Sequence, residues 1–163
     1  MSATDDLLRN AERYAAGFDK GDLAAPPRLR VAVLTCMDAR IVPARILGFD
    51  EGDAHVIRNG GGVASDDAIR SLAISQHMLG TEEIVVIQHT QCGMLTFTDE
   101  EFRERMKEDA GEAPEWPIHT LSDLDGGVRE SVTRLRESPF IPRKGSIRGF
   151  VYDVETGKLR EVS

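Results

Sequence analysis

A near-continuous apolar run occupies residues 29–36 (LRVAVLTC). Such a run is typical of a β-strand that is covered on both faces. A second strand is predicted at 54–59 (AHVIRN) and a third at 83–89 (EIVVIQH). The last part of the chain, from residue 146 on, predicts a further strand and a hairpin that turns at Thr156–Gly157.

Segments with helical periodicity lie between and around these strands. One helix is expected to begin after Ser65, a favourable N-cap, and to end at Gly80. Further helices are expected at 3–16, after the capping box TDEE at 98–101, and at 128–137, with a loop at 111–127. Strands that alternate with helices predict βαβ units. The expected fold class is therefore α/β, a single domain with a mostly parallel central β-sheet flanked by helices and a C-terminal edge strand or hairpin.

The pattern is interrupted at DKGDLAAPP (19–27), where glycine and paired prolines break both periodicities. We therefore expect an N-terminal helix and linker at 1–27 and one α/β domain at 28–163. A chain of 163 residues is long enough to bury a core of this kind.

Charge and composition narrow the class of protein. A formal net charge of −8, without a stripe rich in lysine and arginine, argues against nucleic-acid binding. No apolar run approaches the ~20 residues that cross a bilayer, and the acidic N-terminus lacks the apolar core of a signal peptide. We expect a cytoplasmic protein without nucleic-acid or membrane partners. In a reducing compartment its two cysteines are not expected to form a structural disulfide.

Both cysteines stand near the carboxyl end of an expected strand, where parallel α/β sheets bind ligands. Cys36 ends the first strand and is followed by Asp38 and Arg40, while His89 ends the third strand and precedes Cys92 by three residues. Two thiolates and an imidazole suit zinc, although two inert buried thiols are the alternative.

The position of Asp38 separates two kinds of zinc site. As a fourth ligand it would close the site, which is typical of structural zinc. Arg40 can instead hold the carboxylate in a bidentate pair outside the ligand set, which leaves a position for water and makes the site catalytic.

The glycines at 60–62 (GGG) have three interpretations. A glycine loop before a helix can cradle a phosphate, but the lysine of a P-loop and a full G-x-G-x-x-G are missing. Close approach of the backbone near the metal and a plain turn remain as alternatives.

Three motifs together resemble the beta-class carbonic anhydrases. They are CMDAR at 36–40, HVIRNGGG at 55–62 and HTQCGM at 89–94. The resemblance is close over about residues 28–97 and extends over the whole chain in length and in the order of elements. It implies a zinc enzyme, assembled as a homodimer or a dimer of dimers, whose N-terminal helix reaches over the partner subunit.

The resemblance also implies roles for individual residues. The zinc ligands would be Cys36, His89 and Cys92, with one zinc per chain. Asp38 and Arg40 would form a dyad, in which Asp38 can also close onto the zinc in an inactive state. Gly93 would offer its backbone N–H to the bound substrate oxygen.

The function that follows is reversible hydration of carbon dioxide to bicarbonate and a proton. Zinc-bound hydroxide would be the nucleophile, since zinc lowers the pKa of bound water toward about 7. The alternatives are hydrolysis of carbonyl sulfide or carbon disulfide on the same scaffold, and a non-catalytic, zinc-stabilised binding module. His55, His77 and His119 are candidate proton relays by chemistry alone.

Overall fold

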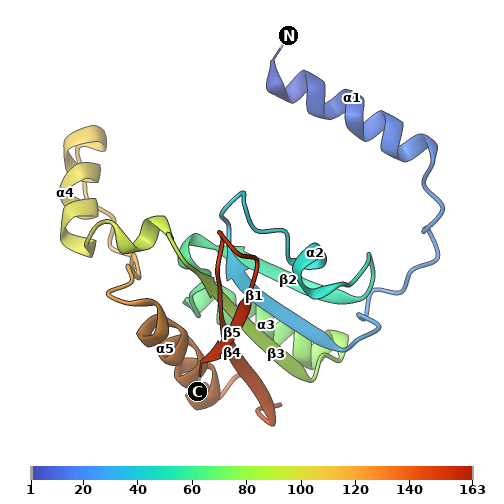
Figure 1. Ribbon diagram of the computed structural model, residues 1–163. Helices are drawn as coiled ribbons and strands as arrows, with labels where there is room; N and C mark the ends of the chain where they lie inside the picture. Colours follow the sequence, from blue (N-terminus) through green and yellow to red (C-terminus); the bar gives the residue numbers. More distant parts are fainter. Residues whose placement is uncertain (1, 163) are drawn as a thin grey trace.

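The computed structural model describes residues 2–162 and has the expected α/β architecture (Figure 1). The first half contains α1 (Ala3–Ala16), β1 (Val31–Cys36), α2 (Pro43–Leu47), β2 (Ala54–Asn59), the 3-10 turn η1 (Gly60–Gly62) and α3 (Asp66–Leu79). The second half contains β3 (Glu83–His89), the 3-10 turn η2 (Gly93–Leu95), α4 (Asp99–Ala110), α5 (Leu124–Glu137), β4 (Ser146–Tyr152) and β5 (Leu159–Val162).

The strands in the described residues form one sheet in the order β2-β1-β3-β4-β5. β1 pairs in parallel with β2 and β3, and β3 pairs in parallel with β4. Only the β4–β5 pair within this part of the chain is antiparallel, and it forms the hairpin at one edge. The structure confirms the predicted fold class.

The core lies between the sheet and the two helices α3 and α5. Leu34 of β1 and Val86 of β3 are fully buried in one cluster with Leu72 of α3 and with Val128 and Leu135 of α5. β1 and β3 lie at the centre of the sheet, so their carboxyl ends are held firmly and close together. A second, smaller cluster lies at those ends and contains Cys36 and Cys92.

The helices differ from the sequence prediction in two places. The predicted loop at 111–127 was wrong for residues 124–127, which belong to α5, because Asp123 caps the helix by accepting a hydrogen bond of 2.6 Å from the Gly126 backbone N–H. A Cβ atom at Gly127 would lie 2.6 Å from Oε1 of Gln88, so the helix needs a glycine at this packing contact. The short helix α2, which starts at Pro43, was not predicted because five residues are too few for a helical period to appear.

The N-terminal helix α1 extends away from the sheet in Figure 1. Within the described residues it buries none of its own side chains, and Leu7, Leu8 and Tyr14 are exposed on it. The Tyr14 hydroxyl donates to Glu51 of the domain. The use of residues 1–27 as an arm on a second subunit stays a prediction. None of the helices in residues 2–162 is long and apolar enough to cross a membrane.

Candidate metal centre

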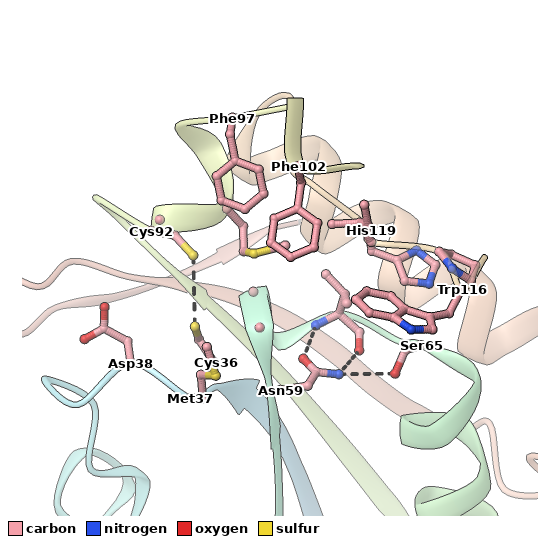
Figure 2. A pocket seen from close by; sticks show the side chains of 17 residues that line it. Cys36, Met37, Asp38, Asn59, Ser65, Cys92, Phe97, Phe102, Trp116 and His119 are labelled. Carbon is pink, nitrogen blue, oxygen red and sulfur yellow. Dashed lines mark hydrogen bonds between the residues drawn. The ribbon is translucent and has the colours of Figure 1, made fainter. Parts of the chain in front are cut away.

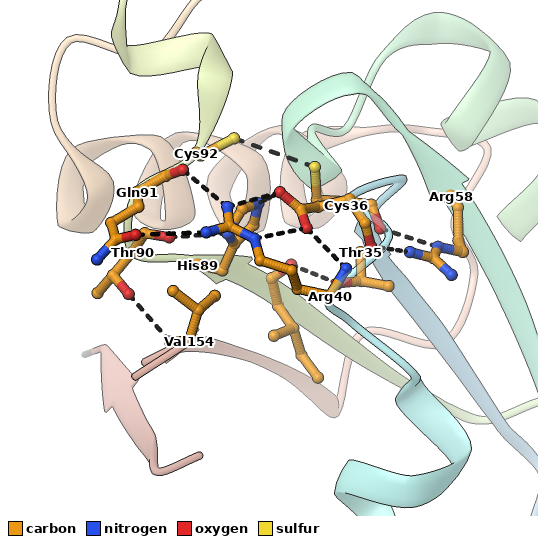
Figure 3. A network of polar contacts seen from close by, with 11 residues as sticks. Thr35, Cys36, Arg40, Arg58, His89, Thr90, Gln91, Cys92 and Val154 are labelled. Carbon is orange, nitrogen blue, oxygen red and sulfur yellow. Dashed lines mark hydrogen bonds and ion pairs between the residues drawn. The ribbon is translucent and has the colours of Figure 1, made fainter. Parts of the chain in front are cut away.

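Three potential metal ligands converge where β1 and β3 end. Cys36 is the last residue of β1, His89 is the last residue of β3, and Cys92 lies just before η2. Their ligand atoms lie within 4.8 Å of one another, and the two sulfur atoms are 4.0 Å apart (Figure 3). All three residues are buried. The structure therefore brings together the cysteines and the histidine that the sequence singles out, and these side chains can hold a metal ion.

Backbone packing fixes the two strand ends at this distance. The Thr35 hydroxyl of β1 donates to the carbonyl of Ile87 in β3 at 2.9 Å. Gly62 of η1 lies over both strands, and a Cβ there would be 2.8 Å from the Cys36 nitrogen and 2.9 Å from the Ile87 oxygen. Of the interpretations of the three glycines, close approach of the backbone is the one that this geometry supports.

The imidazole of His89 has the orientation of a metal ligand. Its Nδ1 lies 2.9 Å from the carbonyl oxygen of Thr90, which accepts the Nδ1–H and leaves Nε2 with a free lone pair. Nε2 is buried and has no hydrogen-bond partner among the described residues. A buried polar atom without a partner is destabilising, and a cation between this nitrogen and the two sulfurs would satisfy it. The donor set of two sulfurs and one nitrogen fits zinc.

One negative charge lies on the thiol pair, at Cys36. The pKa of Cys36 is lowered to about 4, first because the Cys92 thiol donates a hydrogen bond to its thiolate. The pKa of Cys92 is raised by the same contact and by burial. Burial acts to lower the pKa of His89, but the neighbouring Cys36 thiolate outweighs it, so the net shift is upward. A buried anionic pair of this kind favours a bound cation.

Asp38 and Arg40 form a bidentate ion pair beside the three ligands. Arg40 Nε donates to Asp38 Oδ1 at 3.0 Å and Nη2 donates to Oδ2 at 2.8 Å, while the Arg40 backbone N–H also donates to Oδ1. These hydrogen bonds hold the pKa of the Asp38 carboxyl well below its usual range. Oδ2 lies 3.9 Å from Nε2 of His89, so the carboxylate is next to the ligand group but engaged with the arginine.

Arg40 is itself held by residues that the sequence interpretation missed. Its Nη2 donates to the Gln91 carbonyl at 3.0 Å and its Nη1 to Gln91 Oε1 at 3.3 Å. Gln91 Nε2 in turn donates to Glu155 in the β4–β5 turn at 2.7 Å. Gln91 has a φ of +55°, an uncommon value outside glycine. A further arginine, Arg58, donates to the carbonyls of Cys36 and Asp38 at 2.8 and 2.7 Å.

A cavity of about 580 Å³ opens beside the three ligands (Figure 2). Its apolar wall comes from Met94, Phe97, Phe102, Trp116 and Ile118. Its polar lining comes from Asp38, Asn59, Ser65 and His119. Gly93 also lines the cavity, at the start of η2. The arrangement offers an apolar chamber with a metal-binding group and an ionised carboxylate at one end.

Comparison with known proteins relates this geometry to a family. A family model described as carbonic anhydrase matches residues 31–119. The chain is 51% identical over 163 residues to beta-carbonic anhydrase 1 of Mycobacterium tuberculosis H37Rv, covering 100% of this chain and 99% of the relative.

Solved structures and a further relative extend the comparison. A carbonic anhydrase from Streptococcus mutans superposes with a TM-score of 0.94 at 43% identity, covering 100% of this chain and 99% of the other. A carbon disulfide hydrolase of Acidianus sp. A1-3 is 37% identical over an alignment of 181 residues, gaps included. The alignment covers 96% of this chain and 87% of that protein. The fold, the converging residues and these matches show that the chain belongs to the beta-carbonic anhydrase family.

Proposed function

We propose that this protein catalyses the reversible hydration of carbon dioxide to bicarbonate and a proton, with one zinc ion per chain held by Cys36, His89 and Cys92. The observation that carries the proposal is the buried Nε2 of His89, which has no partner in the described residues and faces two thiols. Membership of the beta-carbonic anhydrase family supports the same reaction.

The zinc ion, when bound, supplies the Lewis acidity that allows water to lose a proton near neutral pH. Asp38 accepts a hydrogen bond from the attacking water at a carboxylate oxygen and orients it toward carbon. Arg40 keeps that carboxylate ionised and directed away from the ligand group through its bidentate contact. Gly93 offers its backbone N–H to an oxygen of the substrate.

The cavity suits an uncharged substrate. Carbon dioxide carries no net charge, so an apolar wall such as that of Met94, Phe97 and Phe102 can take it up without a charged partner.

Stopped-flow spectrophotometry with a pH indicator tests the proposal. Purified protein of measured zinc content is mixed with carbon dioxide, and we expect hydration well above the buffer rate. Asp38→Asn, which keeps the shape of the side chain but not its charge, serves as the matched variant and is expected to be strongly impaired. Zinc-loaded wild-type protein that hydrates no faster than buffer would overturn the proposal.

Hydrolysis of carbon disulfide is the second candidate. The 37% identity to a carbon disulfide hydrolase over nearly the whole chain and the apolar cavity wall favour it. The two reactions would use the same metal ligands, so the ligands do not distinguish them. Direct comparison of turnover with the two substrates does. Faster turnover of carbon disulfide, followed as released hydrogen sulfide, would reassign the substrate.

We also propose that the protein is a cytoplasmic homodimer or dimer of dimers. The exposed apolar side chains of α1, including Leu7 (66% exposed) and Tyr14 (57% exposed), support burial of residues 1–27 against a second copy. Cys36 and Cys92 are not joined in a disulfide, which agrees with a reducing compartment. Sedimentation velocity of the full chain tests the assembly, and a monomer at micromolar concentration would contradict it.

A further inference from the structure

The proposed reaction releases one proton for each bicarbonate formed, and that proton must leave a largely apolar cavity. Besides His89, the chain has three histidines, and imidazole is the side chain best suited in general to move protons. His55 is engaged with the Ser75 hydroxyl at 2.7 Å, and His77 lies near the Phe140 carbonyl at 3.2 Å on the exposed side of α3. Neither lines the cavity beside the metal ligands, whereas His119 does.

His119 stands in a wall that two cavities share. On one side is the cavity that contains Cys36, Asp38 and Cys92, where Figure 2 shows His119 opposite the two sulfur atoms. On the other side is a pocket of about 40 Å³, which is room for water and is lined by His119 together with Thr120, Glu130, Ser131 and Arg134. Of the titratable side chains in the described residues, His119 is the one that lines both.

Polar side chains line the first cavity together with the aromatic wall. The apolar wall is formed by the aromatic residues, but Asp38, Asn59 and Ser65 also line this cavity. The Asn59 amide donates to the Ser65 hydroxyl at 3.3 Å and to the Val63 carbonyl at 2.8 Å (Figure 2). Water in the cavity therefore has polar partners at Asp38 and Ser65, which a water chain past the aromatic wall needs.

The surrounding chain holds His119 in place. Its φ is +59°, a value that residues other than glycine rarely adopt. The next residue, Thr120, donates to Asp99 Oδ1 from its backbone nitrogen at 3.0 Å and from its hydroxyl at 2.6 Å. Leu121 N–H donates to the Met94 carbonyl at 2.9 Å. The fold therefore maintains an uncommon backbone conformation that keeps this imidazole at the cavity wall.

We propose that His119 is the proton relay of this enzyme, an inference that rests on the proposed function. In the reaction, water forms a C–O bond with carbon dioxide and one of its O–H bonds breaks, giving bicarbonate and a proton. The proton passes along water to the unprotonated ring nitrogen of His119. The other ring N–H then releases a proton toward the small pocket, where Glu130 and Arg134 are the charged neighbours, and from there to solvent or buffer. Proton exchange with water or a flip of the ring restores the starting tautomer for the next turnover. No oxidation or reduction takes place.

The variant His119→Asn tests the relay. Asparagine tolerates the left-handed backbone conformation but carries no proton near neutral pH. His77→Asn is the matched control, because it removes an imidazole that faces away from the cavity. At low buffer concentration we expect kcat of His119→Asn to fall by about tenfold or more. This is less than the roughly 10²–10⁴-fold contribution of a positioned acid–base group, because buffer and water partly replace the relay. We expect kcat/KM to change little, because it does not report on proton removal after bicarbonate has left.

Added imidazole should restore kcat of His119→Asn in proportion to its concentration and leave His77→Asn unchanged. A His119→Asn protein with wild-type kcat at low buffer, while the wild type is active, overturns the relay and leaves the proposed function intact. Equal losses of kcat and kcat/KM without rescue also overturn the relay. An inactive zinc-loaded wild type overturns the proposed function on which the relay rests.

A second variant guards against misfolding of the first. His119→Gln also lacks an imidazole and is measured in the same way, with the same expected loss of kcat and the same rescue by imidazole. Wild-type kcat at low buffer in a folded, zinc-loaded His119→Gln protein would overturn the relay.

Discussion

Replacing Gly62 with alanine should destabilise the protein and weaken metal binding, because Gly62 packs directly on the backbone beside Cys36. Gly62 has a φ of +63°, and the added Cβ would lie 2.8 Å from the Cys36 nitrogen, 2.8 Å from the Thr35 carbonyl carbon and 2.9 Å from the Ile87 oxygen. All three are backbone atoms of β1 and β3, so no side chain can rotate away to make room.

The expected cost has two parts. The left-handed conformation of a residue with a Cβ costs about 1–2 kcal/mol. Forcing a methyl group into a packed region adds about 1–3 kcal/mol. The free energy of unfolding should therefore fall by about 2–5 kcal/mol, and because the clash lies at Cys36, the affinity for the metal should fall as well.

Gly80 provides the matched control. It also has a positive φ, +74°, but among the described residues no atom lies within 4 Å of its added Cβ. Gly80→Ala should therefore lose only the conformational part, about 1–2 kcal/mol, and should bind zinc like the wild type.

Urea unfolding at one fixed protein concentration measures both variants, since the stability of an oligomer depends on concentration. Zinc content after dialysis provides the second readout. If Gly62→Ala and Gly80→Ala were equally stable and bound equal zinc, the close approach of η1 would not support the metal centre.

Two further outcomes follow from named contacts. Arg40→Ala should retain zinc but lose about a hundredfold or more in kcat, because Asp38 loses its bidentate partner; full activity would refute the role of the pair. Thr120→Val removes the hydroxyl contact that is the largest cause of the lowered pKa of Asp99. Because the pKa of Asp99 is lower in the folded than in the unfolded protein, its carboxylate stabilises the fold at a pH above the unfolded pKa, and this contribution disappears as the pH falls. The free energy of unfolding of the variant should therefore be lower by about 1 kcal/mol at neutral pH. That deficit in urea unfolding should shrink below about pH 4, and a constant deficit would contradict the assignment.

The strands of the sheet could be predicted from the sequence, because each depends on the local order of apolar and polar residues. The segment ending at Cys36 and the segment ending at His89 were both predicted to within two residues at either end. The proximity of the two ends followed from parallel pairing, which places carboxyl ends at one edge.

What the sequence left out depends on tertiary packing. The start of α5 was missed because Gly126 and Gly127 have poor helix propensity. The close packing of Gly127 against Gln88 and Leu121, which explains a glycine there, is visible only in the structure. The contact between Gln91 and Glu155 joins residues 64 positions apart, and no local pattern indicates it. Positive φ values at residues such as His119 are likewise imposed by the surrounding fold.

Zinc titration into metal-free protein, with the carbon dioxide hydration rate measured at each step, tests the central claim most directly. The proposed ligand group predicts a rate that rises in proportion to added zinc and stops rising at about one zinc per chain. A hydration rate that does not depend on zinc, or one that stays at the buffer rate when the site is full, would contradict the account.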